Sequence, residues 1–379
     1  MILKGITWNH SRGITPLLAT SQRFCELYPD VQVVWEKRSL QQFADQSLEA
    51  LTKEYDLLII DHPWVGCAAA TNCVLPLDLH LPPNYLKELA NHSVGKSHQS
   101  YEYDGHQWAL SIDAATPAAS YRTDIFKKEN RPVPATWQEV LSLAKEGRVA
   151  VPAIPIDLLM NFYTFCIAHG QEPFQNNNEV INESIGIQAL QSMRDLFSLI
   201  HPVFYKCNPI LVAEMMSGSN DYWYCPFAYN YSNYSRIGYA ANLLTYTDVV
   251  RFNNEKFRTT LGGTGMAVSA FGSQKEWALR FVQMICSPVW QGGEYVLTGG
   301  QPGYDYAWEK AEVNTICNDF FNNTWPTLNN AYLRPRYNGY LSFQDEGGHY
   351  IQEYLQFGKI TEEMVLDQLN DLYMKSLEK

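Results

Sequence analysis

The chain has 379 residues, of which 18% are charged and 46% are hydrophobic, and its formal net charge is -12 at pH 7. This length and composition predict a globular protein of two domains or lobes, each with a sizeable core. The acidic balance argues against nucleic acid and anionic membrane surfaces as partners. The sequence contains no run of ~20 apolar residues, so we expect no insertion into a membrane.

The first third of the chain alternates predicted strands and helices. Strands are expected at 3–8, 31–36 and 55–61, and helices at 14–28 and 41–53. Thr15 is the expected cap of the first helix, and Pro16 suits its first position. The alternation predicts an α/β fold with a parallel sheet covered by helices. Ligand sites in such sheets lie beyond the carboxyl ends of the strands.

Two polar loops follow predicted strands at that edge, and we expect both to contact a ligand. The candidate residues are Trp8, Asn9, His10 and Arg12 in the first loop, and Asp61, His62 and Trp64 in the second. A helix beginning after His10 would attract hydroxyls or anions. Asp61 could accept hydroxyl hydrogen bonds, with Trp64 as a stacking surface. The alternatives are a solvated, capped first loop, and an Asp61 that caps the next turn while Trp64 packs inward.

The middle of the chain predicts helices at 137–145, 157–169 and 185–200, then an extended aromatic segment at 221–236. A tail helix is expected at 361–374. The chain contains 24 Tyr, 17 Phe and 10 Trp. Tyrosine and tryptophan offer an apolar face and a polar edge, which suits sugars. We therefore expect the aromatic segment to supply a ligand contact, with Trp223 and Tyr224 as candidates. The alternative is that these rings fill a core.

Two blocks of the sequence resemble a known family. Residues 101–147, YEYDGHQWALSIDAATPAASYRTDIFKKENRPVPATWQEVLSLAKEG, predict a turn, a strand, an extended crossing, a second strand and a helix opened by Thr136-Trp137. Residues 261–268, LGGTGMAV, precede a predicted helix at 275–285. Both blocks resemble the lobe crossings of type 1 extracellular solute-binding proteins of the sugar-binding kind. The resemblance extends in element order from residue 3 to the C-terminus.

The resemblance implies a periplasmic-binding-protein-like fold of two α/β lobes, joined by crossing segments, with a ligand cleft between them. Lobe 1 is expected at 1–111 and 262–305, and lobe 2 at 112–261 and 306–379. At the crossings, Asp113 would accept ligand hydroxyls, and Gly263 and Thr264 would bring backbone close to the ligand. Arg334 could hold a carboxylate. The alternatives are a hinge role for Asp113 and a structural role for Arg334.

The leading functional hypothesis is a binding protein without catalytic residues or cofactor. It would capture a small polar ligand, a sugar or sugar derivative, by lobe closure, as the binding component of an ABC importer does. An ABC permease would be its partner if the protein is exported. The alternative is a cytoplasmic enzyme or ligand sensor, with His10, Asp61 and His62 for acid/base chemistry on a hydroxylated substrate. No metal site is expected, because the histidines lack ligand spacing.

The location prediction depends on the N-terminus and the cysteines. Lys4, Asn9, His10 and Arg12 interrupt the stretch where a secretory signal would need an apolar core. Eight scattered cysteines show no C-x-x-C spacing, and their even number permits disulfides that sequence cannot pair. We expect a cytoplasmic chain with reduced thiols for the sequence as written. If a signal segment has been removed, the location is periplasmic or extracellular.

Overall fold

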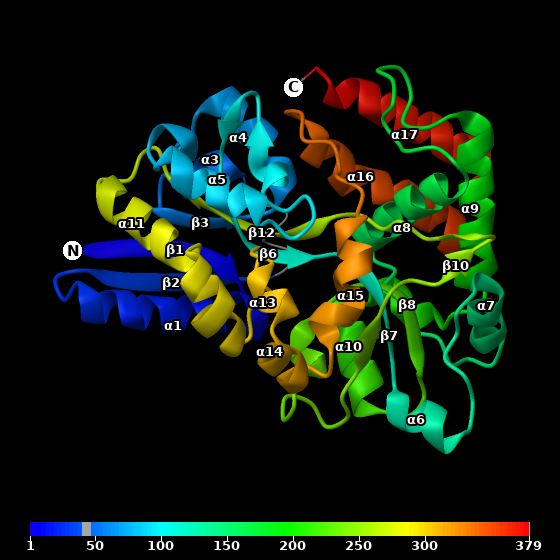
Figure 1. Cartoon of the computed structure of the whole chain (residues 1–379). Helices are drawn as coiled ribbons and strands as arrows, with labels where there is room; N and C mark the ends of the chain where they lie inside the picture. The colour runs from blue at the N-terminus through cyan, green and yellow to red at the C-terminus, as the bar shows by residue number, and fades with distance from the viewer. Residues whose placement is uncertain (40–46, 379) are drawn as a thin grey trace. The chain divides into compact units, whose positions relative to one another are not determined.

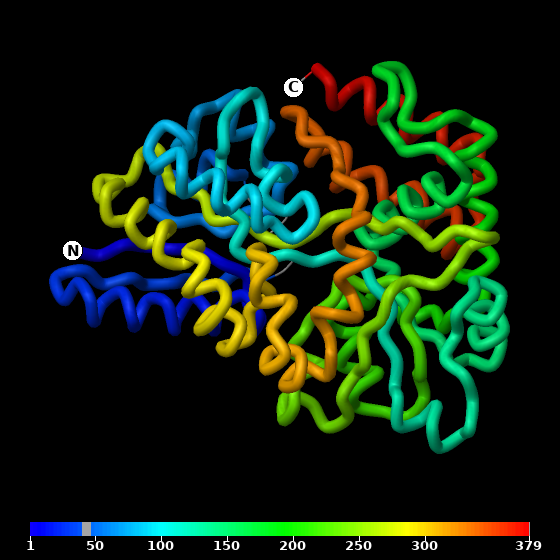
Figure 2. Tube along the Cα trace, viewed as in Figure 1, coloured from blue at the N-terminus to red at the C-terminus, as the bar shows by residue number. Residues whose placement is uncertain are grey.

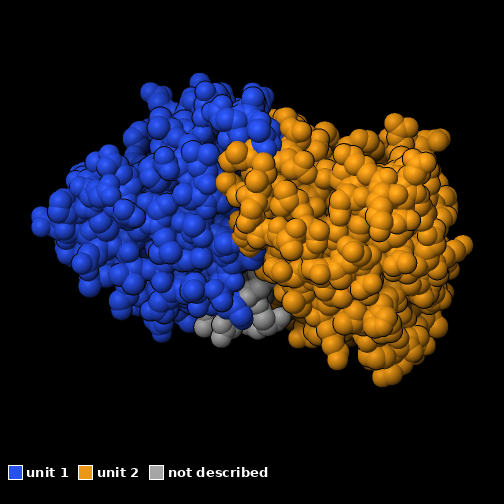
Figure 3. Space-filling view, turned by 90° about the horizontal axis from the view of Figure 1, so that it is seen from below, with its two compact units in different colours: residues 1–115, 262–315, 336–338 blue, residues 116–261, 316–335, 339–379 orange. Residues whose placement is uncertain are grey.

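A computed structural model describes residues 1–39 and 47–378, and the chain divides into two compact units (Figure 3). Unit 1 contains residues 1–115, 262–315 and 336–338, and unit 2 contains 116–261, 316–335 and 339–379. The tube in Figure 2 follows the chain through these segments. The sequence predicted that the first two segments of lobe 1 end at residues 111 and 305. In the structure, the corresponding segments of unit 1 end at residues 115 and 315. Residues 336–338 belong to unit 1, although lobe 2 was their predicted place.

Unit 1 is built on a five-stranded sheet in the order β2-β1-β3-β12-β6. Its strands are β1 (Ile2–Trp8), β2 (Gln32–Arg38), β3 (Leu57–Ile60), β6 (Leu110–Ala115) and β12 (Gly262–Val268). β1 is parallel to β2 and β3, whereas β12 is antiparallel to β3 and β6. The ends of β1, β2, β3 and β6 therefore share one edge of the sheet with the start of β12. A short hairpin, β4 (Glu102–Tyr103) and β5 (His106–Gln107), lies outside this sheet.

Helices cover both faces of the unit 1 sheet (Figure 1). The helices of unit 1 are α1 (Ser11–Leu27), α3 (Leu48–Thr52), α4 (Val65–Thr71), α5 (Pro83–Asn91), α11 (Lys275–Ile285), α12 (Pro288–Trp290), α13 (Tyr306–Glu309) and α14 (Ala311–Ile316), whose last residue belongs to unit 2. Because neighbouring strand residues point to opposite faces, Leu57 and Ile59 pack with α1 and α11, whereas Leu58 and Ile60 pack with α3 and α4. Each fully buried apolar side chain stabilises the fold by roughly 1.5–3 kcal/mol.

The N-terminal helix differs from its prediction. α1 begins at Ser11, three residues before the predicted start, and its cap is His10 rather than Thr15. Pro16 lies inside the helix, where it removes one backbone hydrogen bond without ending the helix. The imidazole of His10 accepts the Arg12 N–H, a capping role that sequence reasoning did not assign to it. Of the helix predicted at 41–53, residues 41–46 lie outside the described residues.

Unit 2 contains a three-stranded sheet in the order β8-β7-β9 and a two-stranded hairpin. Its strands are β7 (Pro117–Tyr121), β8 (Tyr224–Tyr229), β9 (Thr245–Thr247), β10 (Arg251–Phe252) and β11 (Glu255–Lys256). Its helices are α6 (Thr123–Lys128), α7 (Trp137–Lys145), α8 (Pro155–Ala168), α9 (Glu183–Phe197), α10 (Pro209–Gly218), α15 (Phe320–Asn329), α16 (Tyr340–Gln352) and α17 (Glu362–Ser376). The tail helix α17 packs on α9 and α16.

The chain passes between the units at Ala115–Thr116 and again at Leu261–Gly262. In unit 1, β6 pairs with β12 up to Ala115 and Gly262. In unit 2, the Thr116 hydroxyl lies 2.8 Å from the Thr259 hydroxyl and donates to the Thr260 carbonyl at 3.0 Å. Gly263 has a φ of +107°, and a Cβ there would lie 2.3 Å from the Asp113 carbonyl oxygen. The paired strands therefore require glycine at position 263.

Candidate functional site

The strand ends of the unit 1 sheet bring the sequence-predicted loops to one place. We call this the carboxyl edge: the ends of β1, β2, β3 and β6 with the start of β12. Both predicted loops, Asp113 and the Gly263-Thr264 pair lie along it. Ligands of α/β sheets bind at such an edge. Trp8, the last residue of β1, is only 4% exposed and packs in the core against Gly13.

A buried ion pair lies at the carboxyl edge. The Arg12 guanidinium donates from Nε to Asp113 Oδ2 at 2.9 Å, and from Nη2 to Asp113 Oδ1. The two residues are 4% and 1% exposed. The pair joins the first turn of α1 to the end of β6, so the Asp113 carboxylate already accepts two charge-assisted hydrogen bonds. This contact favours a positioning role for Arg12 and Asp113 over the predicted direct contact with ligand.

His10 presents a neutral imidazole at the same edge. Burial, and next the positive charge of Arg12, lower the pKa of His10 to about 4. Its Nδ1 accepts the Arg12 N–H at 3.0 Å, so the ring proton of the neutral form resides on Nε2. His10 is therefore a hydrogen-bond donor at neutral pH. Its neighbour Asn9 is exposed, and its backbone N–H donates to the Arg38 carbonyl at 2.8 Å.

The second loop forms a short 3-10 turn, His62–Trp64, that continues into α4. Asp61 caps this turn by accepting the His62 N–H at 2.8 Å on Oδ1. His62 is fully buried, and its ring meets Tyr101 edge-on at 6.4 Å. Trp64 is half-buried and packs in part against the adjoining core. The loop thus combines the capping role of Asp61 with a partly exposed tryptophan face.

Thr264 adds a hydroxyl to the carboxyl edge. It lies opposite Asp113 in the β6–β12 register and is 8% exposed. Within the described part of the chain, its buried hydroxyl has no hydrogen-bond partner. A buried hydroxyl without a partner costs ~1–3 kcal/mol, which a bound ligand could recover.

In unit 2, the segments next to the crossings present a tyrosine. Tyr229 ends β8, pairs with Pro117 at the start of β7, and its hydroxyl lies 2.9 Å from the Thr260 hydroxyl. Trp223 and Tyr224 lie at the opposite end of β8, where Tyr224 pairs with Tyr121. Sequence reasoning named residues at the start of this strand and could not tell which of its ends adjoins the crossings.

Trp223 and Arg334 are both in contact with other side chains of unit 2. The Trp223 ring packs edge-on against Phe126 at 5.9 Å and lies beneath the guanidiniums of Arg131 and Arg148. Arg334 is 4% exposed and donates to Gln344 Oε1 at 2.7 Å. Neither geometry tests the predicted ligand contact, which remains a prediction for both residues.

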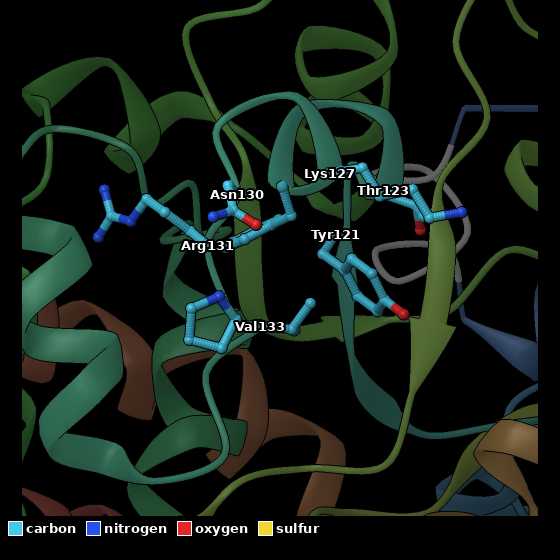
Figure 4. Close-up of a pocket in the computed structure, with 8 residues that line it drawn as sticks. Tyr121, Thr123, Lys127, Asn130, Arg131 and Val133 are labelled. Carbon is cyan, nitrogen blue, oxygen red and sulfur yellow. The ribbon is translucent and has the colours of Figure 1, made fainter.

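A surface hollow of about 580 Å³ lies in unit 2 at the Tyr121 end of β7 (Figure 4). Its lining comes from the end of β7, from α6 and from the segment that follows: Tyr121, Thr123, Phe126, Lys127, Asn130, Arg131, Pro132 and Val133. None of the sequence-predicted site residues lines it. Within unit 2, it lies at the far end of β7 from the crossing at Thr116.

Sequence reasoning missed a pair of buried polar side chains on α8. Asp157 and Asn161 are one helical turn apart, and they are 5% and 3% exposed. Asp157 Oδ2 and Asn161 Nδ2 have no hydrogen-bond partner among the described residues. Burial raises the pKa of Asp157 to about 8, so its carboxyl group is mostly protonated at neutral pH. The only sequence signal was an acidic residue in the first helical turn.

Residues 1–39 and 47–378 offer neither a metal site nor a membrane-spanning helix. No group of three or more His, Cys, Asp or Glu side chains in that range is arranged to hold a metal ion. Of the helices in that range, none combines the length and the apolar character that crossing a bilayer requires.

The family model of bacterial extracellular solute-binding proteins matches residues 9–292 of the chain. The chain belongs to this family. A curated relative, the maltotriose-binding protein of Pyrococcus abyssi (strain GE5 / Orsay), is 26% identical over 120 residues, which is 32% of this chain. That match spans about a quarter (25%) of the relative's length.

Solved structures of sugar- and polyol-bound proteins share the fold over nearly the whole chain. The maltose-bound MalE3 of T. maritima matches with a TM-score of 0.85 and 17% identity, covering 98% of both chains. An ABC transporter solute-binding protein from Agrobacterium radiobacter K84, in complex with ribitol, matches with a TM-score of 0.83 and 19% identity, covering 99% of this chain and 98% of that one. The chain therefore has the two-lobed fold of solute-binding proteins, as the sequence blocks predicted.

Proposed function

We propose that this solute-binding protein captures a sugar or a sugar-like polyol and presents it to an ABC importer. Relatives that are described by their ligands bind maltotriose, maltose and ribitol. All three ligands are neutral and rich in hydroxyl groups. A site for them needs uncharged donors, oxygen acceptors and an apolar surface, because each buried hydroxyl without a partner costs ~1–3 kcal/mol.

The groups at the carboxyl edge match these needs. Neutral His10 can donate through Nε2, Asp61 can accept on the oxygen that does not cap the turn, and the Thr264 hydroxyl can do either. Trp64 offers an aromatic face for sugar C–H groups. The observation that supports the proposal most directly is that all four residues lie along one edge of the sheet, where Arg12 and Asp113 also neutralise each other.

The mechanism that we propose is capture by lobe closure. A ligand that binds the closed state more tightly than the open state shifts the population towards closure. The paired segments at Ala115–Thr116 and Leu261–Gly262 would absorb the motion. Small-angle scattering should show a smaller radius of gyration when the ligand is present. An unchanged radius with saturating ligand would contradict closure, although not binding itself.

We propose an extracytoplasmic location with an ABC permease as the partner, since the family is described as extracellular. This is the second of the two locations that the sequence left open. Fractionation of cells that express the natural gene, with markers for each compartment, tests it. Recovery in the cytoplasmic fraction alone would favour the sensor or enzyme alternative, which the comparisons do not support.

A thermal-shift screen tests the ligand class. A panel of maltose, maltotriose, ribitol and acidic sugars should contain at least one compound that stabilises the protein, by roughly 2.7 kcal/mol at 100 times its Kd. Thr264→Val should weaken that compound's binding while leaving the unliganded fold as stable or slightly more stable. Thr123→Val, on α6 of unit 2, is the matched control and should not change affinity. Conversion of the ligand to product by the wild type would instead favour an enzyme.

A further inference from the structure

A three-residue segment of unit 1 is separated in sequence from the rest of that unit. Residues 336–338 lie between 316–335 and 339–379, which belong to unit 2. The chain therefore enters unit 1 and leaves it again after three residues. Gly339, the next residue, is the N-cap of α16 and has a φ of +101°, which glycine adopts without steric cost. So short a segment needs contacts that hold it in unit 1.

The side chain of Arg336 provides the first contact. Its Nη1 donates to the carbonyl oxygens of Gln99 at 2.9 Å and Ser100 at 3.3 Å, and also to that of Glu102. Gln99 and Ser100 belong to a 3-10 turn, Gln99–Tyr101, that leads directly into β4. Carbonyl oxygens gather at the C-terminal end of a helical turn, and a cation there is favourable. Arg336 therefore caps the chain where it enters the β4–β5 hairpin.

The backbone of the 336–338 segment makes the second contact, with the first turn of α4. Gly66 is the second residue of this helix and is buried. A Cβ at Gly66 would lie 2.0 Å from the Arg336 carbonyl oxygen and 2.7 Å from the Asn338 backbone nitrogen. Both are backbone atoms, so neither can move aside unless the segment moves. The close approach of the helix and the segment therefore requires glycine at position 66.

These two contacts connect the segment to the candidate ligand site. α4 follows the His62–Trp64 turn without a break, so the position of its first turn sets the position of Trp64. Within unit 1, α4 also packs against β4, and Trp64 and Tyr103 contact the same core cluster. Arg336 thus holds β4 through its side chain and α4 through its backbone.

We propose that Arg336 is a positioning residue of the ligand site, which holds α4 and the His62–Trp64 turn in place from a distant part of the sequence. This role rests on the proposed function, in which Trp64 offers its aromatic face to a sugar or polyol. Without the guanidinium, the 336–338 segment loses its anchor and α4 opens locally more often. The rest of unit 1 keeps its own contacts, so the effect is confined to one part of the unit.

Hydrogen exchange measured by mass spectrometry tests the anchor in the unliganded protein. Arg336→Met retains the aliphatic stem and removes the donors, so amides of residues 65–72 and 101–108 should exchange roughly tenfold faster or more. Amides of α11, which packs on the other face of the sheet, should exchange as in the wild type. Arg336→Lys retains a cation with three donors and should restore much of the protection. Unchanged exchange at 65–72, or an equal increase throughout unit 1, would overturn the proposal.

Two glycine variants test the same anchor from the side of α4. Gly66→Ala adds a methyl group where the 336–338 backbone lies, and it should speed exchange in the same two stretches. Gly218→Ala is the matched control, because a Cβ at this end of α10 meets no atom of the described chain within 4 Å. Wild-type exchange in Gly66→Ala would also count against the anchor. If Gly66→Ala does not fold, the Arg336→Met measurement still decides.

Calorimetry then tests the link to binding, with maltose, maltotriose and ribitol as probes. For each probe that the wild type binds, Arg336→Met should weaken binding roughly fivefold or more, and it should add little to Trp64→Ala because both changes act through one side chain. Losses that simply multiply would overturn the link between Arg336 and Trp64. If the wild type binds none of the three, the proposed function fails for these probes, while the exchange measurement still decides whether Arg336 holds α4.

Discussion

Among residues 1–39 and 47–378, each unit buries one carboxyl group, and the two are accommodated in opposite ways. Asp113 in unit 1 is 1% exposed and is held by two contacts from Arg12, so it is buried as half of an ion pair. Asp157 in unit 2 is 5% exposed with no cation beside it, and burial raises its pKa to about 8. Burying an isolated charge is so unfavourable that a group without a counter-ion retains its proton instead. Burial alone therefore does not predict charge.

The two carboxyl groups also differ in their place relative to the proposed ligand site. The ion pair lies at the edge where we propose that ligand binds, and it fixes the first turn of α1 against β6. Asp157 and Asn161 lie on α8 and retain unsatisfied polar atoms within the described chain. Unit 1 therefore holds its buried carboxylate in an organised ion pair, whereas unit 2 holds a buried carboxyl group without a cation, whose titration makes stability depend on pH.

The largest expected effect comes from breaking the ion pair. Arg12→Met leaves the Asp113 carboxylate buried without its partner and should lower the free energy of unfolding by ~3–5 kcal/mol. Urea denaturation measures this change. Arg23→Met removes a solvent-exposed ion pair of the same helix and should cost under ~1 kcal/mol. The double variant Arg12→Met/Asp113→Leu should recover most of the loss, and no recovery would mean that the pair has a role beyond charge compensation.

The second-largest effect concerns Asp157. Here the substitution is expected to raise the free energy of unfolding rather than lower it. The pKa of Asp157 is raised in the folded state, so the unfolded chain loses this proton at a lower pH than the folded chain does. The free energy of unfolding therefore falls as the pH rises from about 4 to about 8. Asp157→Asn removes the dependence and should raise the free energy of unfolding at pH 8 by roughly 2 kcal/mol or more, with a smaller gain at pH 5. Denaturation curves at both pH values measure it. The exposed Asp195→Asn on α9 should show no such gain, and equal gains at both pH values would refute the assignment.

The third effect is on binding. With a ligand identified, Trp64→Ala should weaken binding at least tenfold, ~1.4 kcal/mol, because the sugar loses its aromatic surface. Isothermal titration calorimetry measures the affinity. Trp277→Ala, on α11 of the same unit, removes a tryptophan that packs against Tyr28 and should leave affinity unchanged. If both variants bind like the wild type, Trp64 does not contact the ligand.

The smallest effect is the pH response of His10. The pKa of His10 is lowered to about 4 in the folded state, so the unfolded chain gains this proton at a higher pH than the folded chain does. The free energy of unfolding therefore falls as the pH decreases from about 6.5 to about 4. His10→Asn retains a capping side chain and should reduce the difference in unfolding free energy between pH 7 and pH 5 by ~1 kcal/mol. The exposed His201→Asn is the control. An unchanged difference in the His10 variant would mean that this imidazole is protonated in the native state.

The sequence by itself determined the fold class and the local elements that make it. The run YDLLIID predicts a strand buried on both faces, and Leu57, Leu58, Ile59 and Ile60 are each no more than 1% exposed. Apolar periodicity and turn residues act over a few positions, so these elements can be recognised locally. The order of the blocks around Asp113 and Gly263 then indicated the two-lobed family, and the family match agrees with it.

Only the tertiary structure decided which groups meet. Arg12 and Asp113 are separated by 101 positions, and no local pattern pairs them. The capping role of His10 and the end of β8 at which Trp223 lies also depend on how the chain turns and on strand register. A pKa or a hydrogen-bond role is set by the few ångströms around a group, and residues from distant segments fill that space once the chain has folded.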